Sequence, residues 1–285
     1  MLKSIYRFLS PKFQSIFLEY KVDFKPRTYG AENAKAHPEL FAIINKNRSL
    51  YQDTLTGFLQ HKEVFNSFKE DKNETNQNLP TWNNQFLPGL DIIAIYGMIC
   101  KHQPKKYIEV GSGNSTKVVK KAINDKNLDT KIYSIDPFPR ANIDQLSDEI
   151  IRQPFENLKD FSVFDELERG DIVFIDNSHR CLPNSDATVF FLEVMPRLKP
   201  GVIVHIHDIY LPYDYPQFMC DRAYSEQYVL AAFVLANPKK YKTILPNFFI
   251  SEDPTLKTVL KPIWELENLK NVEHHGGSFW LEILE

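Results

Sequence analysis

Apolar residues in the first quarter of the chain recur at intervals of three and four positions. Between His37 and Phe65 they include Leu40, Ile44 and Leu55. This spacing places them on one face of a helix, so it predicts helices over residues 37–65. The polar stretch that follows, residues 69–80, ends at Pro80 and predicts a loop.

From about residue 84 the pattern changes to short apolar runs that alternate with helical stretches. Helices are expected at 86–103, 115–123, 141–148 and 185–198, and strands at 106–111, 131–136, 149–154, 171–176 and 201–208. Two further strands, 241–250 and 277–284, flank a helix-like stretch at 253–269. Because buried parallel strands are nearly continuous apolar runs, the alternation indicates right-handed βαβ crossovers.

The fold class is therefore α/β, a doubly wound and mostly parallel sheet. We expect a helical N-terminal extension or lid over residues 1–83 and a core domain over residues 84–285. In such sheets, ligands bind beyond the carboxyl ends of the strands. Four carboxylates lie at expected strand ends and would share that edge, namely Glu109, Asp136, Asp176 and Asp208.

The first of these strands runs into the turn "GSGNST", with Gly111 and Gly113. A dinucleotide-binding loop needs a third glycine, and Thr116 occupies that position; no GK[ST] of a phosphate-binding loop follows. Two glycines still let the backbone pass close to a ligand. Asp136 ends the next strand, where an acid receives the ribose hydroxyls of an adenosine ligand. A turn-forming role before Pro137 is the alternative for Asp136.

Charge and cysteine content narrow the functional classes. The net charge is −3, which gives no support to a nucleic-acid partner. Cys100, Cys181 and Cys220 lie far apart and are typical of reduced thiols, so a cytoplasmic location is expected. No apolar run approaches the roughly 20 residues of a membrane helix. The aromatic N-terminus is expected to be a helical arm that packs on its own protein, with a membrane surface or a partner subunit as alternatives.

Together, "EVGSGNST", "YSIDPFP", "GDIVFIDNSHR" and "LKPGVIVHIHDIYLP" resemble the class I S-adenosylmethionine-dependent methyltransferases. The branch concerned carries Asp-x-x-His after strand four and His-Asp after strand five. The resemblance covers residues 84–284 and implies a seven-stranded Rossmann-like methyltransferase sheet. It also implies a cofactor site in which Asp136 holds the ribose of S-adenosylmethionine. The methionine end would be enclosed by Glu109, Gly111 and Gly113, with hydroxyl contacts from Ser115 and Thr116.

Two chemistries suit the cluster after strands four and five. Asp176 and Asp208 are suitable oxygen ligands for Mg²⁺, which would lower the pKa of a substrate hydroxyl. His179 or His207 is suitable as a general base because the histidine pKa lies near neutral pH. Three of these residues have a structural alternative: a helix cap for Asp176, a surface loop for His179 and a core histidine for His207. His205 is expected in the core.

The favoured function is transfer of a methyl group from S-adenosylmethionine to a hydroxyl of a small molecule or sugar. The alternatives are a non-catalytic cofactor-binding protein, a dinucleotide oxidoreductase, and a non-haem iron hydroxylase with Asp176, His179, His207 and Asp208 as ligands. A homodimer formed through the N-terminal arm is a further expectation. Aromatic residues such as Trp82, Tyr210 and Tyr215 either line the acceptor site or pack the N-terminal helices onto the sheet.

Overall fold

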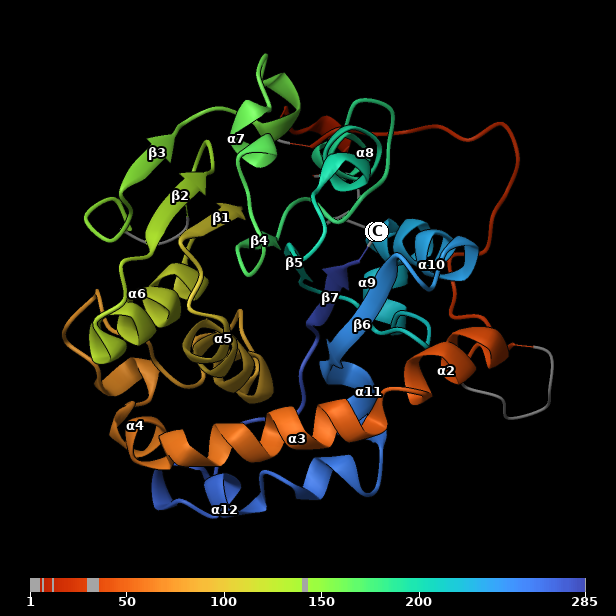
Figure 1. The fold of residues 1–285 in the computed structure, drawn as a ribbon. Coiled ribbons are helices and arrows are strands. Elements are labelled where there is room, and N and C mark those ends of the chain that lie inside the picture. Colours follow the sequence, from red (N-terminus) through yellow and green to blue (C-terminus); the bar gives the residue numbers. More distant parts are fainter. Residues whose placement is uncertain (1–5, 7, 12, 30–35, 140–142, 285) are drawn as a thin grey trace.

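The computed structural model describes residues 6, 8–11, 13–29, 36–139 and 143–284. Its centre is a seven-stranded sheet in the order β3-β2-β1-β4-β5-β7-β6 (Figure 1). The strands are β1 (Lys106–Val110), β2 (Lys131–Ile135), β3 (Glu149–Ile151), β4 (Ile172–Ile175), β5 (Ile203–Ile206), β6 (Tyr241–Pro246) and β7 (Phe279–Ile283). Strands β1 to β5 pair in parallel, whereas β7 is antiparallel to both β5 and β6. The predicted doubly wound, mostly parallel sheet is confirmed.

Helices cover both faces of this sheet (Figure 1). Helices α5 and α6 lie side by side on one face, and α8 and α10 lie on the other, while α3 crosses below the sheet. The α-helices are α2 (Pro38–Asn45), α3 (Arg48–Phe58), α4 (Lys62–Ser67), α5 (Gly89–His102), α6 (Asn114–Lys126), α7 (Ser162–Asp165), α8 (Asp186–Val189), α9 (Gln217–Cys220), α10 (Glu226–Ala236), α11 (Asn247–Glu252) and α12 (Lys261–Trp264). A π-helical turn, Phe190–Val194, and a 3₁₀ turn, Met195–Arg197, extend α8.

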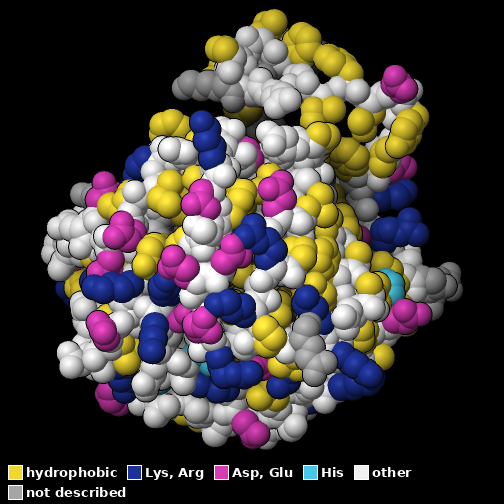
Figure 2. Space-filling model, turned by 45° about the horizontal axis from the view of Figure 1, so that its top comes forward, with side chains coloured by type: hydrophobic (Ala, Val, Ile, Leu, Met, Phe, Trp, Pro, Cys, Tyr) yellow, Lys and Arg dark blue, Asp and Glu magenta, His cyan; other side chains and the backbone are white. Residues whose placement is uncertain are grey.

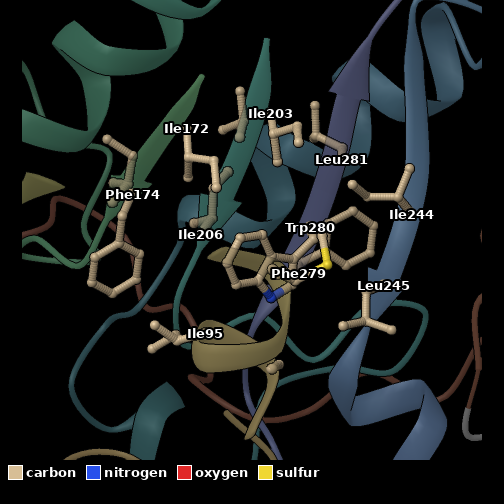
Figure 3. Close-up of a cluster of buried hydrophobic side chains, with 14 of the residues drawn as sticks. Ile95, Ile172, Phe174, Ile203, Ile206, Ile244, Leu245, Phe279, Trp280 and Leu281 are labelled. Carbon is tan, nitrogen blue, oxygen red and sulfur yellow. The ribbon is translucent and has the colours of Figure 1, made fainter. Parts of the chain in front are cut away.

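The core lies on the central strands, as their apolar composition predicts. Figure 3 shows Ile172 and Phe174 of β4 beside Ile203 and Ile206 of β5, with Phe279, Trp280 and Leu281 of β7 following. Every residue of β4 and β5 is buried. Burial of each such aliphatic or aromatic side chain contributes about 1.5–3 kcal/mol, so packing on these strands stabilises the sheet.

The N-terminal helices belong to the same hydrophobic core as the sheet. Leu40, Ile44 and Leu55 of α2 and α3 are buried in one cluster with the residues of β4, β5 and β7. Arg48 adds an ion pair to Asp253, and the Asn47 side chain donates to the Thr243 carbonyl at 3.0 Å. The predicted boundary near residue 83 therefore separates two segments that share one core.

Three sequence expectations differ from the structure. The described part of the expected helix 141–148 is a turn, because the Asp148 carboxylate accepts a hydrogen bond from the Ile132 backbone and fixes the entry to β3 instead. The expected strand 241–250 ends at Pro246 and continues as α11. The stretch 253–269 is broken into short turns around α12.

A fourth difference, at the N-terminus, is the largest. Residues 13–29 are described without any helix, and their apolar side chains are exposed. Figure 2 shows hydrophobic side chains gathered on the lobe that stands off the body at the top of the view. Pro11 and Pro26 oppose helix continuation here, and a helix needs a packing surface for its apolar face. None of the described helices has the length and apolar composition that a membrane span requires.

Candidate functional site

The predicted acids do meet at the carboxyl edge of the sheet. Asp136 and Asp176 directly follow β2 and β4, Gly111 directly follows β1, and Asp208 is the second residue after β5. Because β1, β2, β4 and β5 are neighbouring parallel strands, their ends lie together at one edge.

The turn after β1 requires glycine at its first position. Gly111 has φ +85°, and a Cβ atom there would lie 1.9 Å from the backbone oxygen of Asp176. A side chain is therefore excluded both by the left-handed backbone and by the close passage of the β4 end. At Gly113, in contrast, a Cβ atom would meet nothing within 4 Å, and the residue faces open space in the cavity described below.

Glu109 lies behind this turn, fully buried. It accepts hydrogen bonds from the hydroxyls of Thr116 (2.5 Å) and Ser115 (3.3 Å) at the start of α6. Thr116 in turn accepts from the Gly113 backbone at 3.1 Å. Burial raises the pKa of Glu109 to about 8, although the hydroxyls favour its charged form. Glu109 and Thr116 therefore hold the turn in shape from behind.

A cavity of about 620 Å³ opens in front of the turn. Of the predicted cofactor residues, Gly111, Gly113, Ser115 and Asp136 line it, as does Asp176. Both carboxylate oxygens of Asp136 are held by the backbone: Ser112 N–H donates to one at 2.9 Å and Phe138 N–H donates to the other at 2.8 Å. Each oxygen keeps a second lone pair, so this carboxylate is fixed and still able to accept hydroxyl donors.

A second cavity, of about 520 Å³, adjoins the first. The segment Gln85 to Leu87 lines both, so it forms the wall between them. Asp208 lines the second cavity together with apolar residues that include Phe218 and Met219. Asp176 thus faces one cavity and Asp208 the other.

His207 lies beside these two acids and is held at both ring nitrogens. Its Nε2 lies 3.2 Å from the buried carboxylate of Asp91 on α5. Its Nδ1 lies 3.5 Å from Asp176 and 3.6 Å from Asp208. Burial alone would lower the pKa of His207, but the three carboxylates outweigh burial and place that pKa well above its ordinary value. The carboxylates on both sides of the ring therefore favour the charged form of His207.

His179 reaches the same two acids from the opposite side. Its Nε2 lies 3.5 Å from both Asp176 and Asp208, and its Nδ1 is 2.6 Å from the buried carboxylate of Glu226 on α10. The ring stacks on Tyr224, with 4.5 Å between centroids. Burial opposes protonation, but Glu226, Asp176 and Asp208 outweigh it and raise the pKa of His179. Its backbone is left-handed, at φ +63°, a conformation that clusters at functional sites.

The side chains at this edge, Asp176, Asp208, His179 and His207, are of types that bind metal ions, but they are not arranged as a metal centre. Two carboxylates suit Mg²⁺, which takes oxygen ligands in an octahedron. Over the described residues, however, no group of three or more His, Cys, Asp or Glu side chains is arranged to hold a metal ion. The carboxylates of Asp176 and Asp208 instead flank the two imidazoles.

The remaining candidates are structural. His205 is buried, stacks on Trp280 at 3.7 Å between centroids and lies 2.7 Å from the Ser278 hydroxyl, which confirms the expected core role. Trp82 and Tyr215 are fully buried and pack inside the protein, so neither forms an acceptor wall. Tyr210, in contrast, lines the second cavity.

Sequence reasoning missed the roles of two buried acids, Asp91 and Glu226, because both lie on helices far in sequence from the strand ends. Asp91 carried a usable signal: it is a single acid within the apolar run "GLDIIAIYGMIC", and a buried charge needs partners. Glu226 lies at the start of α10 in a polar loop and carried no such signal. The extension also contributes more than expected, since Asp71 and Gln77 line the first cavity.

Comparison with known proteins agrees with this arrangement. Residues 108–209, from β1 to just beyond β5, match the model of a family described as a methyltransferase domain. This central part of the chain is thus similar to a methyltransferase domain, which supports the enzyme class predicted from the sequence. No curated protein matches the chain.

Several solved structures are similar in fold. A Podospora anserina methyltransferase, PaMTH1, bound to SAH has 13% identity and a TM-score of 0.43, over 80% of this chain and 88% of that one. An O-methyltransferase from Bacillus cereus in complex with SAH has 13% identity and a TM-score of 0.36, over 87% and 99%. The plantazolicin methyltransferase BamL has 14% identity and a TM-score of 0.39, over 86% and 100%. These likenesses are too distant to indicate a substrate.

Proposed function

We propose that this chain, whose core is a methyltransferase domain, transfers a methyl group from S-adenosylmethionine to a hydroxyl oxygen of a small molecule or sugar, with His179 as the base. The first cavity would hold the methyl donor and the second the acceptor. The single observation that carries this proposal is the position of His179 Nε2, 3.5 Å from both Asp176 and Asp208, which line the two cavities.

The donor assignment is supported by the fixed acceptors along the first cavity. Asp136 offers two oriented carboxylate oxygens to a pair of ribose hydroxyls, and Gly111 and Gly113 leave the backbone open to close approach. S-adenosylmethionine supplies a methyl group on a sulfonium sulfur, which leaves as a neutral thioether. The contribution of the chain is to hold the acceptor oxygen near that carbon and to remove its proton.

The two histidines are suited to different roles. His179 keeps the hydrogen on Nδ1 through Glu226, which leaves Nε2 as the proton acceptor. Three carboxylates flank each histidine, but the pKa of His207 is raised well above its ordinary value, which makes His207 the less suited of the two to accept a proton. Its role would be to orient Asp176 and Asp208 and to balance their charge.

Mg²⁺-assisted deprotonation, with Asp176 and Asp208 as ligands, is the alternative route. We favour the histidine base because both carboxylates already flank cationic His207. Dialysis of the protein against EDTA, followed by assay with and without Mg²⁺, separates the two routes. The proposal expects unchanged turnover, whereas an activity that requires Mg²⁺ would assign the deprotonation to the metal.

The function is tested by a methyl-transfer assay over a panel of hydroxylated small molecules and sugars. His179→Ala is expected to lose about 10²- to 10⁴-fold in kcat, as for removal of a general base, while still binding S-adenosylhomocysteine. His274→Ala is the matched control, because that histidine stacks on Trp264 in a separate part of the molecule. Equal loss in both variants, or none in His179→Ala, would refute the assignment.

The arm before residue 29 supports a proposal about assembly. Its exposed residues include Phe8, Leu9, Phe17 (81% exposed) and Tyr20, more apolar surface than a lone protein ordinarily leaves in water. The arm is joined to the body by hydrogen bonds from Arg27 N–H to Asp214 and from the Gln217 side chain to the Phe24 carbonyl. We propose that it contacts a second copy of the chain. Light scattering should then give the mass of a dimer for the full chain and the mass of a monomer after deletion of residues 1–23. A monomer mass for the full chain would contradict the proposal. The absence of a nucleic-acid partner and a cytoplasmic location remain predictions.

A further inference from the structure

One cation that lines the first cavity has no ion-pair partner among the described residues. Lys117 lies in the first turns of α6, and its side chain lines the cavity although the residue is only 7% exposed. It makes no ion pair or side-chain hydrogen bond with any residue in the described part of the chain. Because no anion lies at ion-pairing distance, the ammonium group is available to an anionic group of a bound ligand.

Asp71 faces the same space from the N-terminal extension. It lines the cavity, and its negative charge acts on Lys117. The carboxylate is held in place because Oδ1 accepts from the Thr81 hydroxyl at 2.9 Å. The backbone is fixed as well, since Asp71 N–H donates to the Trp82 carbonyl at 2.9 Å. The two charges lie too far apart for an ion pair, so a gap lies between them.

We propose that Lys117 and Asp71 form a clamp for the zwitterionic α-amino acid group of the methyl donor, Lys117 binding its carboxylate and Asp71 its ammonium group. This inference rests on the proposed function, since it names the recognition of the donor in the same cavity. An α-amino acid group carries both charges on one carbon, which matches an anion and a cation that line the same cavity. The N-terminal end of the 13-residue helix α6 adds favourable potential for the carboxylate.

The clamp also assigns a role to the extension before the core domain. Asp71 lies in the loop between α4 and α5, whereas Lys117 lies on α6. Donor binding would therefore join the two segments, and the loop that carries Asp71 and Gln77 would form one wall of the donor site. Of the N-terminal extension, which was expected to act as a lid, only this loop would then cover the donor.

The test uses calorimetric titration with three ligands that differ only in the amino acid group. S-adenosylhomocysteine carries both charges, its decarboxylated analogue keeps the ammonium group, and 5′-methylthioadenosine has neither. Lys117→Met is expected to weaken S-adenosylhomocysteine by roughly tenfold to a hundredfold, the usual range for a charged hydrogen bond. The other two ligands should change by less than about threefold in this variant. Asp71→Asn should weaken the first two ligands and leave the third unchanged.

Lys121→Met is the matched control, because Lys121 lies on the same helix and pairs with Asp125 outside the cavity. It should leave all three affinities unchanged. The clamp is overturned if Lys117→Met binds S-adenosylhomocysteine as wild type does, or if it weakens 5′-methylthioadenosine equally. Failure of wild type to bind any of the three ligands would overturn the proposed function as well, so the two failures are distinguishable.

Discussion

The carboxylate of Asp91 is the group whose removal should most affect the stability of the site. It is fully buried and accepts four hydrogen bonds: from His207 Nε2 (3.2 Å), the Asn247 amide (2.7 Å), Gly277 N–H (2.8 Å) and Ser278 N–H (3.1 Å). Asp91→Ala leaves these donors buried and unpaired, with His207 charged. Breaking a buried ion pair in this way costs about 3–5 kcal/mol of unfolding free energy.

The pH dependence of this loss of unfolding free energy follows from the pKa values of Asp91 and His207. Burial would raise the pKa of Asp91, but its hydrogen bonds to His207, Asn247 and Gly277 outweigh burial and lower it. Its contribution is present above its ordinary pKa of 3.8 and is lost as pH falls through the lowered value. His207 contributes fully below its ordinary pKa of 6.5, and this contribution is lost as pH rises through its raised pKa. The difference between wild type and Asp91→Ala should therefore be largest between these two pKa values.

Urea denaturation followed by circular dichroism at about pH 5.5 measures the difference directly. Asp165→Ala is the matched control, because Asp165 forms an exposed pair with Arg197 and a surface pair contributes at most about 1 kcal/mol. The reasoning is wrong if Asp91→Ala destabilises no more than Asp165→Ala, or if its effect does not vary with pH.

Two further predictions concern the base and the glycine turn. A base must be neutral, so kcat/KM should rise with pH through the raised pKa of His179. Glu226→Gln should move that rise to lower pH, because it removes the largest charge that favours protonation of His179. A pH profile that does not move in this variant would exclude the pairing of Glu226 with His179. Gly111→Ala should lower the free energy of unfolding, measured by urea denaturation, by more than about 3 kcal/mol, because its Cβ atom would meet a backbone oxygen at 1.9 Å. Gly113→Ala should change the free energy of unfolding by no more than about 1 kcal/mol. Equal stability of the two variants would contradict the assigned geometry.

The sheet could be predicted from the sequence because buried parallel strands are short, continuous apolar runs. β1, β2, β4 and β5 all follow that rule, and the acids at their ends could be placed at one edge for the same reason. Elements whose form depends on a distant partner could not be predicted. Asp148 turns the chain into β3 through a bond to Ile132 on β2, and the arm over residues 13–29 has no surface that would fold it into a helix.

The sequence predicted only those site residues that follow the ends of strands. Asp176, Asp208, His179 and His207 follow strand ends, so their convergence follows from topology alone. Which histidine is suited to be the base depends on Asp91 and Glu226, which reach the site from α5 and α10. Packing of helices against the sheet brings these acids to the histidines, and local pattern carries no information about that packing.

The most direct test of the whole account is a calorimetric titration of the purified protein with S-adenosylhomocysteine, with NAD as the comparison ligand. The account predicts that S-adenosylhomocysteine binds at one site per chain, that NAD does not bind, and that Asp136→Ala loses most of the affinity while remaining folded. Binding of NAD instead, or an unchanged affinity in Asp136→Ala, would contradict the assignment of the cavity after β1 to a methyl donor.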